Sequence, residues 1–203
     1  MAAYISESHR YFRLAKKIRA ELNDDNTASY SVVGSCASYL ESVANDVIFS
    51  WQFNQKNGFS NFTIDPRLQS LDIHDYKSKM GPKEKWTRIL YPDRDWKAVS
   101  DEQLNQIEKV IRLRNRLVHL QPTEQVQGLA NNRGPESVLS YLYEKRIVED
   151  PNAPGVYWPD VVTHKVSDWA IELTRVFIGY AYERTFFMPF GIKVLHWESL
   201  QLG

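Results

Sequence analysis

The sequence predicts an all-α protein, a bundle of four long helices with short extra helices and an apolar C-terminal tail. Two observations carry this prediction. Apolar residues recur every three or four positions through several long segments, which is the period of a helix that buries one face. Proline and glycine fall between these segments, and no stretch reads as a convincing β-hairpin. The 203 residues, 43% of them hydrophobic, suit a single domain over 1–203 with a sizeable core.

The N-terminal half is expected to contain the longest helix. Residues 6–23 are predicted to form a first helix with an apolar face made of Tyr11, Leu14, Ile18 and Leu22. Residues 28–54 are predicted to form the longest helix, because apolar residues make a continuous stripe along them: Val33, Cys36, Leu40, Val43, Val47 and Trp51. Gly58 and Pro66 then predict an irregular segment over 57–70, with room for one turn of helix.

Two further helices are predicted in the middle of the chain. Pro82 opens a short helix over 81–91, since proline is tolerated in the first helical turn. Ser100 is expected to cap the next helix, with Gln103 at the capping-box position. That helix runs to about His119 and stops before the next proline. Its apolar side consists of Leu104, Ile107, Val110, Ile111, Leu117 and Val118.

The C-terminal part is expected to be helical as well. A polar loop over 123–134 leads to a helix over 135–148 and then to a proline-containing loop over 149–160. The last long helix spans 164–185, and an apolar tail follows over 186–203. A monomer of this size would struggle to bury all the aromatic side chains near this end, which favours an interface; they are Tyr180, Tyr182, Phe186, Phe187, Phe190 and Trp197.

Charge and cysteine content bound the class of protein. Lys and Arg together number 25, as do Asp and Glu, so the formal net charge is zero. Proteins that coat nucleic acid usually carry a basic excess, so this balance allows only a local nucleic-acid site. The single cysteine, Cys36, excludes an internal disulfide and fits a reducing compartment. No signal-peptide core and no run of membrane-spanning length is present, so a cytoplasmic protein with no membrane partner is expected.

Arg114 interrupts the apolar side of the helix that follows Ser100. Successive helical residues are about 100° apart, which places Arg114 in the middle of that side, while Arg112 and Arg116 point away. Because burying an unpaired guanidinium is costly, Arg114 needs a partner. Two interpretations are open, namely a structural ion pair between helices or an arginine held so that it points into a cleft. His119, five residues later, is either a cap of the helix C-terminus or part of the same cleft.

Glu41 is predicted to be the partner of Arg114. On the helix over 28–54, Glu41 is the carboxylate that lies beside small residues, and these would let another helix approach closely. Asn45 follows one helical turn later on the same side. We therefore expect Glu41, with Asn45 nearby, to meet Arg114 across a helix interface.

Three segments together resemble the HEPN superfamily. "RNRLVH" contains Arg114, Asn115 and His119 and is similar to the family motif, in which an arginine, commonly followed by a polar residue, precedes a histidine. "SYLESVANDVI" resembles the second helix of many HEPN domains, where Glu and Asn interrupt an apolar stripe, and "EKWTRIL" with the helix ending "LRNRLVHLQP" resembles the later stretch. The resemblance covers residues 28–122 and implies a HEPN-like bundle, with 123–203 as a helical C-terminal elaboration.

The resemblance implies a metal-independent endoribonuclease without a cofactor, acting in antiviral defence or as a toxin in a stress response. The catalytic residues would be Arg114, Asn115 and His119, and the supporting residues Glu41 and Asn45. Active members form a symmetric homodimer that brings two motifs face to face, so a homodimer with an RNA substrate is expected. An antitoxin or a defence-system protein would be a further partner. Within the family, a toxin subgroup regulated by an antitoxin often has a tyrosine where this chain has Gln121, so that regulation is not expected here.

The residue types themselves suit RNA cleavage by the ribose 2′-hydroxyl. A histidine titrates near neutrality and can take or give a proton, and an arginine can contact two phosphate oxygens at once. No metal site is predicted, because the five histidines are scattered and "DIHD" around His74 lies in an expected loop with no partner motif. The alternative function is a non-catalytic HEPN-type protein-interaction or RNA-binding module, which the neutral net charge favours.

RNA contacts are predicted from a basic and aromatic segment over 77–97. It has seven basic and three acidic residues with aromatic residues between them, a composition that can hold single-stranded RNA by phosphate contact and stacking. The competing interpretation is that Trp86 belongs to the core and that the lysines are ordinary surface residues. The basic residues assigned to RNA contact are Arg88, Arg94, Lys97, Arg112 and Arg116.

Overall fold

The computed structural model describes residues 8–21, 26–56, 79–92, 94–118, 138–150 and 161–184. These residues form six helices and no strand, which confirms the all-α prediction for this part of the chain. The helices are α1 (His9–Glu21), α2 (Asn26–Lys56), α5 (Pro82–Leu90), α6 (Glu102–Val118), α8 (Val138–Glu144) and α9 (His164–Arg184). The predictions for 57–70, 123–134 and the tail over 186–203 fall outside the described residues.

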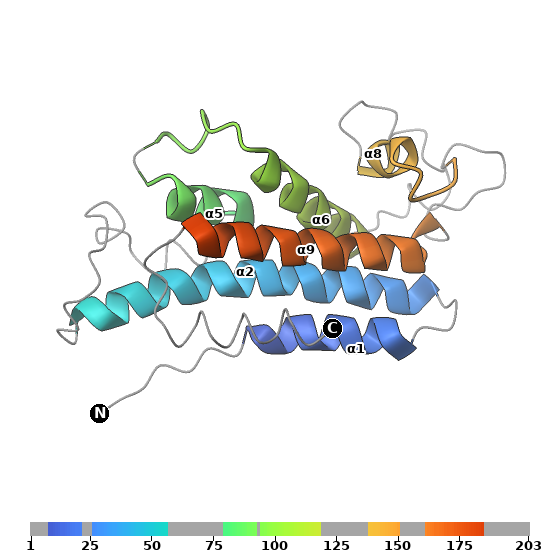
Figure 1. Cartoon of the computed structure of the whole chain (residues 1–203), viewed down its shortest axis with the longest axis horizontal. Helices are drawn as coiled ribbons and strands as arrows, with labels where there is room; N and C mark the ends of the chain where they lie inside the picture. The colour runs from blue at the N-terminus through green and yellow to red at the C-terminus, as the bar shows by residue number, and fades with distance from the viewer. Residues whose placement is uncertain are drawn as a thin grey trace.

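The helix α2 is the element around which the others pack. Its 31 residues contact α1, α9, α6 and α5, and Figure 1 shows α1, α2 and α9 lying side by side. The apolar stripe predicted for this segment accounts for the arrangement, since five of its side chains are fully buried: Val33, Cys36, Leu40, Val43 and Val47. The side chain of Trp51, the sixth, is not among those described.

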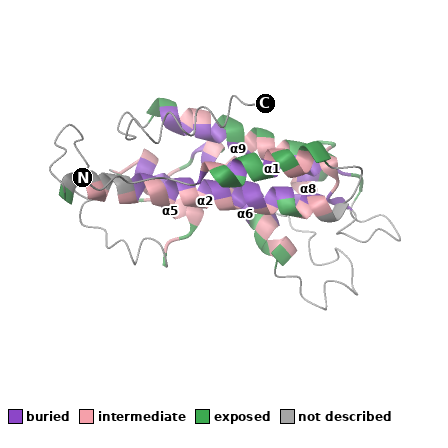
Figure 2. Ribbon diagram, turned by 90° about the horizontal axis from the view of Figure 1, so that it is seen from below, coloured by how far each residue is buried: buried purple, intermediate pink, exposed green. Residues whose placement is uncertain are grey.

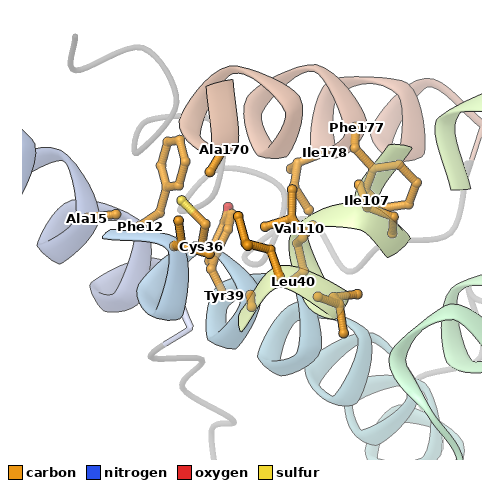
Figure 3. Close-up of a cluster of buried hydrophobic side chains, with 14 of the residues drawn as sticks. Phe12, Ala15, Cys36, Tyr39, Leu40, Ile107, Val110, Ala170, Phe177 and Ile178 are labelled. Carbon is orange, nitrogen blue, oxygen red and sulfur yellow. The ribbon is translucent and has the colours of Figure 1, made fainter. Parts of the chain in front are cut away.

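The core lies between α2 and the helices around it. Figure 3 shows Phe12 of α1, Cys36 of α2 and Ala170 of α9 converging at one end, with Ile107 and Val110 of α6 further along. Figure 2 shows the buried positions running along α2 and the exposed ones on the outer sides of α1 and α9. Burial also raises the pKa of the Cys36 thiol to about 12, because the apolar surroundings disfavour the thiolate.

Aromatic side chains join α1 to α2 and α5 to both α9 and α2. The ring of Phe12 stacks on that of Tyr39 with the centroids 5.0 Å apart, and Trp86 of α5 meets Phe177 of α9 edge to face at 4.9 Å. Trp86 is fully buried, and its Nε1 donates a hydrogen bond of 3.0 Å to the backbone oxygen of Leu40. Trp86 is thus a core residue, as the competing interpretation held, and it ties α5 to both α2 and α9.

The helix α1 packs with a different face from the predicted one. Phe12 and Ala15 are buried, and Arg19, one turn further along that side, donates hydrogen bonds of 2.6 and 2.8 Å to Asp168 of α9. The small alanine lets α1 approach α2, and the ion pair allows this side to end in an arginine. The predicted face is wrong at two positions, which are 44% and 47% exposed: Tyr11 and Leu14.

The helix α5 begins at Pro82 as predicted, whereas α6 begins one residue later than expected. Asp101, not Ser100, is its N-cap, because Oδ1 of Asp101 accepts a hydrogen bond of 3.0 Å from the backbone amide of Leu104. Asp101 is also buried, while Ser100 is exposed. The carboxylate is preferred as the cap because it has a second oxygen that tyrosine hydroxyls from other helices can reach.

Asp101 joins the ends of three helices. Its Oδ2 accepts hydrogen bonds from the hydroxyls of Tyr91 and Tyr180, whose oxygens are 3.1 Å apart. Nη1 of Arg184 donates to the Tyr91 hydroxyl at 3.2 Å. Burial acts to raise the pKa of Asp101, but the hydrogen bonds from the two tyrosines and from two backbone amides outweigh it and hold the pKa below its usual range.

The Asp101→Asn variant is expected to lose about 1–2 kcal/mol of unfolding free energy at pH 7, because asparagine keeps the cap but not the charged acceptor. The pKa of Asp101 is lowered by folding, so its contribution is fully present above the unfolded value of about 3.9 and is lost as the pH falls through the folded value. Urea unfolding at pH 7 and pH 3 measures this. A stability difference between the two proteins that does not shrink at the lower pH contradicts the prediction.

The helix α8 ends earlier than the helix predicted over 135–148. The backbone amide of Ile147 donates to the carbonyl of Leu142 at 2.9 Å, and Arg146 has a φ of 58°. This is a Schellman turn, in which the left-handed position is usually glycine. Because an arginine occupies it here, the sequence carries no stop signal at this point. The first predicted residues, 135–137, lie outside the described part.

Candidate functional site

Arg114 lies near the end of α6, on the side that faces α2. One turn before it, Val110 and Ile111 are buried, and the Arg114 side chain itself is 26% exposed. Its Nη2 donates to Oε2 of Glu41 at 3.4 Å, across the interface of α6 and α2. The predicted contact between Glu41 and Arg114 is therefore confirmed, while the roles of both residues in a site remain predictions.

A second cation, Lys85 of α5, reaches the same carboxylate. Its Nζ lies 3.4 Å from Oε1 of Glu41, and its side chain is completely buried. The sequence interpretation missed this residue. A signal was present, because Lys85 precedes Ile89 by one helical turn and so belongs to the buried side of a short amphipathic helix. The argument applied to Arg114, that a cation on an apolar side needs a carboxylate, applies equally to Lys85.

Asn45 lies one turn beyond Glu41 on α2 and is partly buried. Among the described residues, its Oδ1 is a buried atom without a hydrogen-bond partner, and so is Nε of Arg114. The first is an acceptor and the second a donor, and each is left unsatisfied by the residues that the structure describes. The prediction that Asn45 supports Arg114 stays a prediction, since no hydrogen bond joins the two within the described part of the chain.

The end of α6 departs from the predicted pattern at two positions. Leu113 is fully buried although it was not assigned to the apolar side, and Val118, which was assigned to it, is 63% exposed.

Asn115 is exposed, next to Arg114. The prediction for His119 falls outside the described residues, so its placement relative to Arg114 stays a prediction.

The basic residues assigned to RNA contact have local partners of their own. Arg88 pairs with Glu84 at 2.7 Å, and Arg112 pairs with Glu108 at 2.7 Å. The guanidinium of Arg94 lies over the ring of Tyr91, and the ammonium of Lys97 lies over Trp96, 5.3 and 5.6 Å from the ring centroids. Arg116 is partly buried. These contacts are arranged along α5, α6 and the segment between them, and they do not by themselves mark a shared RNA groove.

Glu108 anchors α5 to α6 beside this region. It accepts a hydrogen bond of 2.6 Å from Nζ of Lys83, which also contacts Oδ1 of Asn105 at 3.2 Å. Burial acts to raise the pKa of Glu108, but the hydrogen bonds and charges of Lys83 and Arg112 outweigh it, so the pKa lies below its usual range. Lys83 and Glu108 thus join α5 to α6 beside the site, without contacting Glu41.

The described ranges contain neither a metal-binding cluster nor a membrane-spanning helix. No three or more His, Cys, Asp and Glu side chains gather there in a group that could hold a metal ion; the segment around His74 lies outside those ranges. No helix in the described part of the chain combines the length and the apolar character that crossing a membrane requires.

Comparison with known proteins adds no assignment to this geometry. The chain matches no protein-family model, no curated protein and no solved structure.

Proposed function

We propose that the protein is a metal-independent endoribonuclease of the HEPN type, with Arg114, Asn115 and His119 as its catalytic residues. The observation that carries the proposal is that Arg114 is held by Glu41 and yet stays partly exposed. It is anchored to Glu41 through one nitrogen, and its side chain keeps 26% exposure at the surface of the bundle. An arginine that served only as a helix-to-helix tie would gain from closer contact with its carboxylate. The exposed Asn115 beside it adds a polar group on the same turn.

The proposed reaction is attack of a ribose 2′-hydroxyl on the adjacent phosphorus. The bond between O2′ and phosphorus forms, the bond between phosphorus and O5′ breaks, and the products are a 2′,3′-cyclic phosphate and a 5′-hydroxyl. His119 takes the proton of the 2′-hydroxyl, and a second acid gives a proton to O5′. Arg114 stabilises the extra negative charge on the phosphate oxygens during the reaction. In a homodimer, His119 of the second copy supplies the missing acid.

We expect the purified protein to cleave single-stranded RNA in the presence of EDTA. The reason is that the nucleophile comes from the substrate and the charge is met by Arg114, so no metal-bound water is needed. Mass spectrometry of the products should find 2′,3′-cyclic phosphate ends, and an oligonucleotide with 2′-O-methyl riboses should remain intact. Loss of cleavage on chelation, or products that carry 5′-phosphates, contradicts the mechanism.

We expect a homodimer in solution with a mass twice that of the 23.7 kDa chain, measured by light scattering at micromolar concentration. The interface should include the end of α6 and bury more than about 1,200 Å² in total. Two of the aromatic residues that were expected at such an interface make their contacts within one protomer instead. Tyr182 is buried, and the hydroxyl of Tyr180 is hydrogen-bonded to Asp101. A single species at the mass of one chain contradicts both the dimer and a site composed of two motifs.

The second candidate function is a non-catalytic HEPN-type interaction module. The observation that favours it is the contact of Glu41 with cations from two other helices, because such a contact is also what a purely structural charge cluster looks like. The neutral net charge favours it too. In that case the protein would form its dimer and lose stability when Glu41 is replaced, yet it would leave RNA intact. The roles in defence or stress response, and an antitoxin or defence-system partner, are proposed together with the ribonuclease activity.

A further inference from the structure

The carboxylate of Glu41 is divided between two cations. Its Oε1 faces Nζ of Lys85 and its Oε2 faces Nη2 of Arg114, each at 3.4 Å. Charge-assisted hydrogen bonds between nitrogen and a carboxylate are usually about 2.7–2.9 Å long. Both contacts are therefore long, and the guanidinium of Arg114 does not close onto the carboxylate in the two-pronged way that arginine prefers.

Other ion pairs in this protein are closer. Arg19 makes two hydrogen bonds to Asp168, at 2.6 and 2.8 Å. Glu108 is shared by two cations, as Glu41 is, and yet it lies 2.6 Å from Lys83 and 2.7 Å from Arg112. Sharing a carboxylate is therefore not enough to lengthen the contacts.

The burial of Lys85 explains the difference. The two cations that share Glu108 are 32% and 50% exposed, so their side chains can adjust until both are close. Lys85 is completely enclosed, and it directly precedes Trp86, whose side chain is hydrogen-bonded to α2. Packing thus fixes the position of its Nζ. Glu41 has to remain between a fixed ammonium and Arg114, so it cannot move fully toward either.

We propose that Lys85 is a positioning residue for Arg114. By holding Oε1 of Glu41, it keeps the guanidinium from closing onto the carboxylate, and it thereby leaves guanidinium donors of Arg114 available to the oxygens of an RNA phosphate. The inference rests on the proposed function for its ligand. The enclosed side chain of Lys85 does not reach the surface, so it acts through Glu41 and Arg114.

The test compares Lys85→Met with Lys83→Met, a matched lysine-to-methionine change on the same helix that leaves Glu41 untouched. Methionine has a volume close to that of lysine, and Glu41 is 34% exposed and keeps Arg114 as its partner, so the change should cost little stability. The rate at which phenylglyoxal modifies Arg114 is measured by mass spectrometry of the full chain after digestion. RNA cleavage and the urea unfolding midpoint are measured on the same samples.

In Lys85→Met, the carboxylate is expected to close onto Arg114, so modification of Arg114 and cleavage of RNA should each slow by about threefold or more, the effect of one partly exposed ion pair. The unfolding midpoint should change little, and Lys83→Met should change neither rate. Adding Glu41→Gln to Lys85→Met should restore the modification rate, because the neutral amide attracts the guanidinium less. Lys85→Gln gives the same comparison in a variant that keeps a polar side chain, should the methionine variant not fold.

The outcomes separate this inference from the proposed function. If Arg114 is modified as fast in Lys85→Met as in the unsubstituted protein, or faster, the positioning role is wrong, whether or not RNA is cleaved. If modification slows while the unsubstituted protein leaves RNA intact, Lys85 does position Arg114 and the ribonuclease proposal is wrong. If cleavage slows together with modification, both are supported.

Discussion

Cleavage of RNA by the Arg114→Ala variant is expected to be at least about a hundredfold slower than by the unsubstituted protein, the scale of one preorganised charge-stabilising group. The alanine removes the guanidinium that would meet the developing charge on the phosphate oxygens. It leaves Glu41 paired with Lys85, so the fold should survive the change. Single-turnover cleavage of a labelled single-stranded RNA, with the variant in excess, measures the chemical step directly.

His119→Ala is expected to show a loss of the same order or larger, because it removes an acid–base group. The two changes together should cost little more than the larger of them if both residues serve one step. The matched control is Arg175→Ala on α9, an exposed arginine in an ion pair with Glu172, which should cleave at the normal rate. Either site variant cutting as fast as this control would show that the site is not catalytic.

Replacing Glu41 by alanine is expected to lower the free energy of unfolding by about 3 kcal/mol, because two cations lose their carboxylate and one of them is fully buried. The larger share of the effect comes from Lys85. Arg114 is partly exposed, so water can solvate its guanidinium when the carboxylate is gone. Urea denaturation followed by circular dichroism gives the value. A loss below about 1 kcal/mol, the scale of an exposed pair, would mean that Lys85 does not depend on Glu41.

Two further variants isolate the cause of that loss. Glu172→Ala removes an exposed carboxylate that pairs with Arg175 three residues away on the same helix, and it should cost no more than about 0.5 kcal/mol. Adding Lys85→Met to Glu41→Ala should recover part of the stability, because the buried charge is then gone. If the double variant is as unstable as the sum of the single changes, the energy lies in packing and not in the charge.

The elements with strong local signals were predictable from the sequence. The stripe on α2 repeats over many turns, so the burial of its five described residues follows from periodicity. Pro82 marks the start of α5 because proline fits the first turn of a helix. The pairing of Glu41 with Arg114 was predictable too, since a cation on an apolar side needs a carboxylate and Glu41 lies beside small residues.

The remaining features depend on contacts that periodicity does not contain. The packed face of α1 is set by Ala15, which is small enough for a close approach, and by the ion pair of Arg19, so a count of apolar residues favoured Tyr11 instead. The cap of α6 is Asp101 because Tyr180 comes from 79 residues away to share its carboxylate. In the site, Lys85 was missed because the lysines of the basic segment over 77–97 were interpreted alike as surface residues, whereas the Lys85 side chain is fully buried.

Because of the position of Cys36, the reactivity of its thiol reports how readily the packed helices separate. Cys36 is the only cysteine in the chain, it is fully buried among α1, α2 and α9, and burial raises its pKa to about 12. The thiolate is the form of cysteine that attacks thiol reagents, and in the native state the Cys36 side chain is both enclosed and protonated. Labelling can proceed only through excursions that separate the three helices. When the helices close faster than the thiolate reacts, the labelling rate therefore reports the population of the open state.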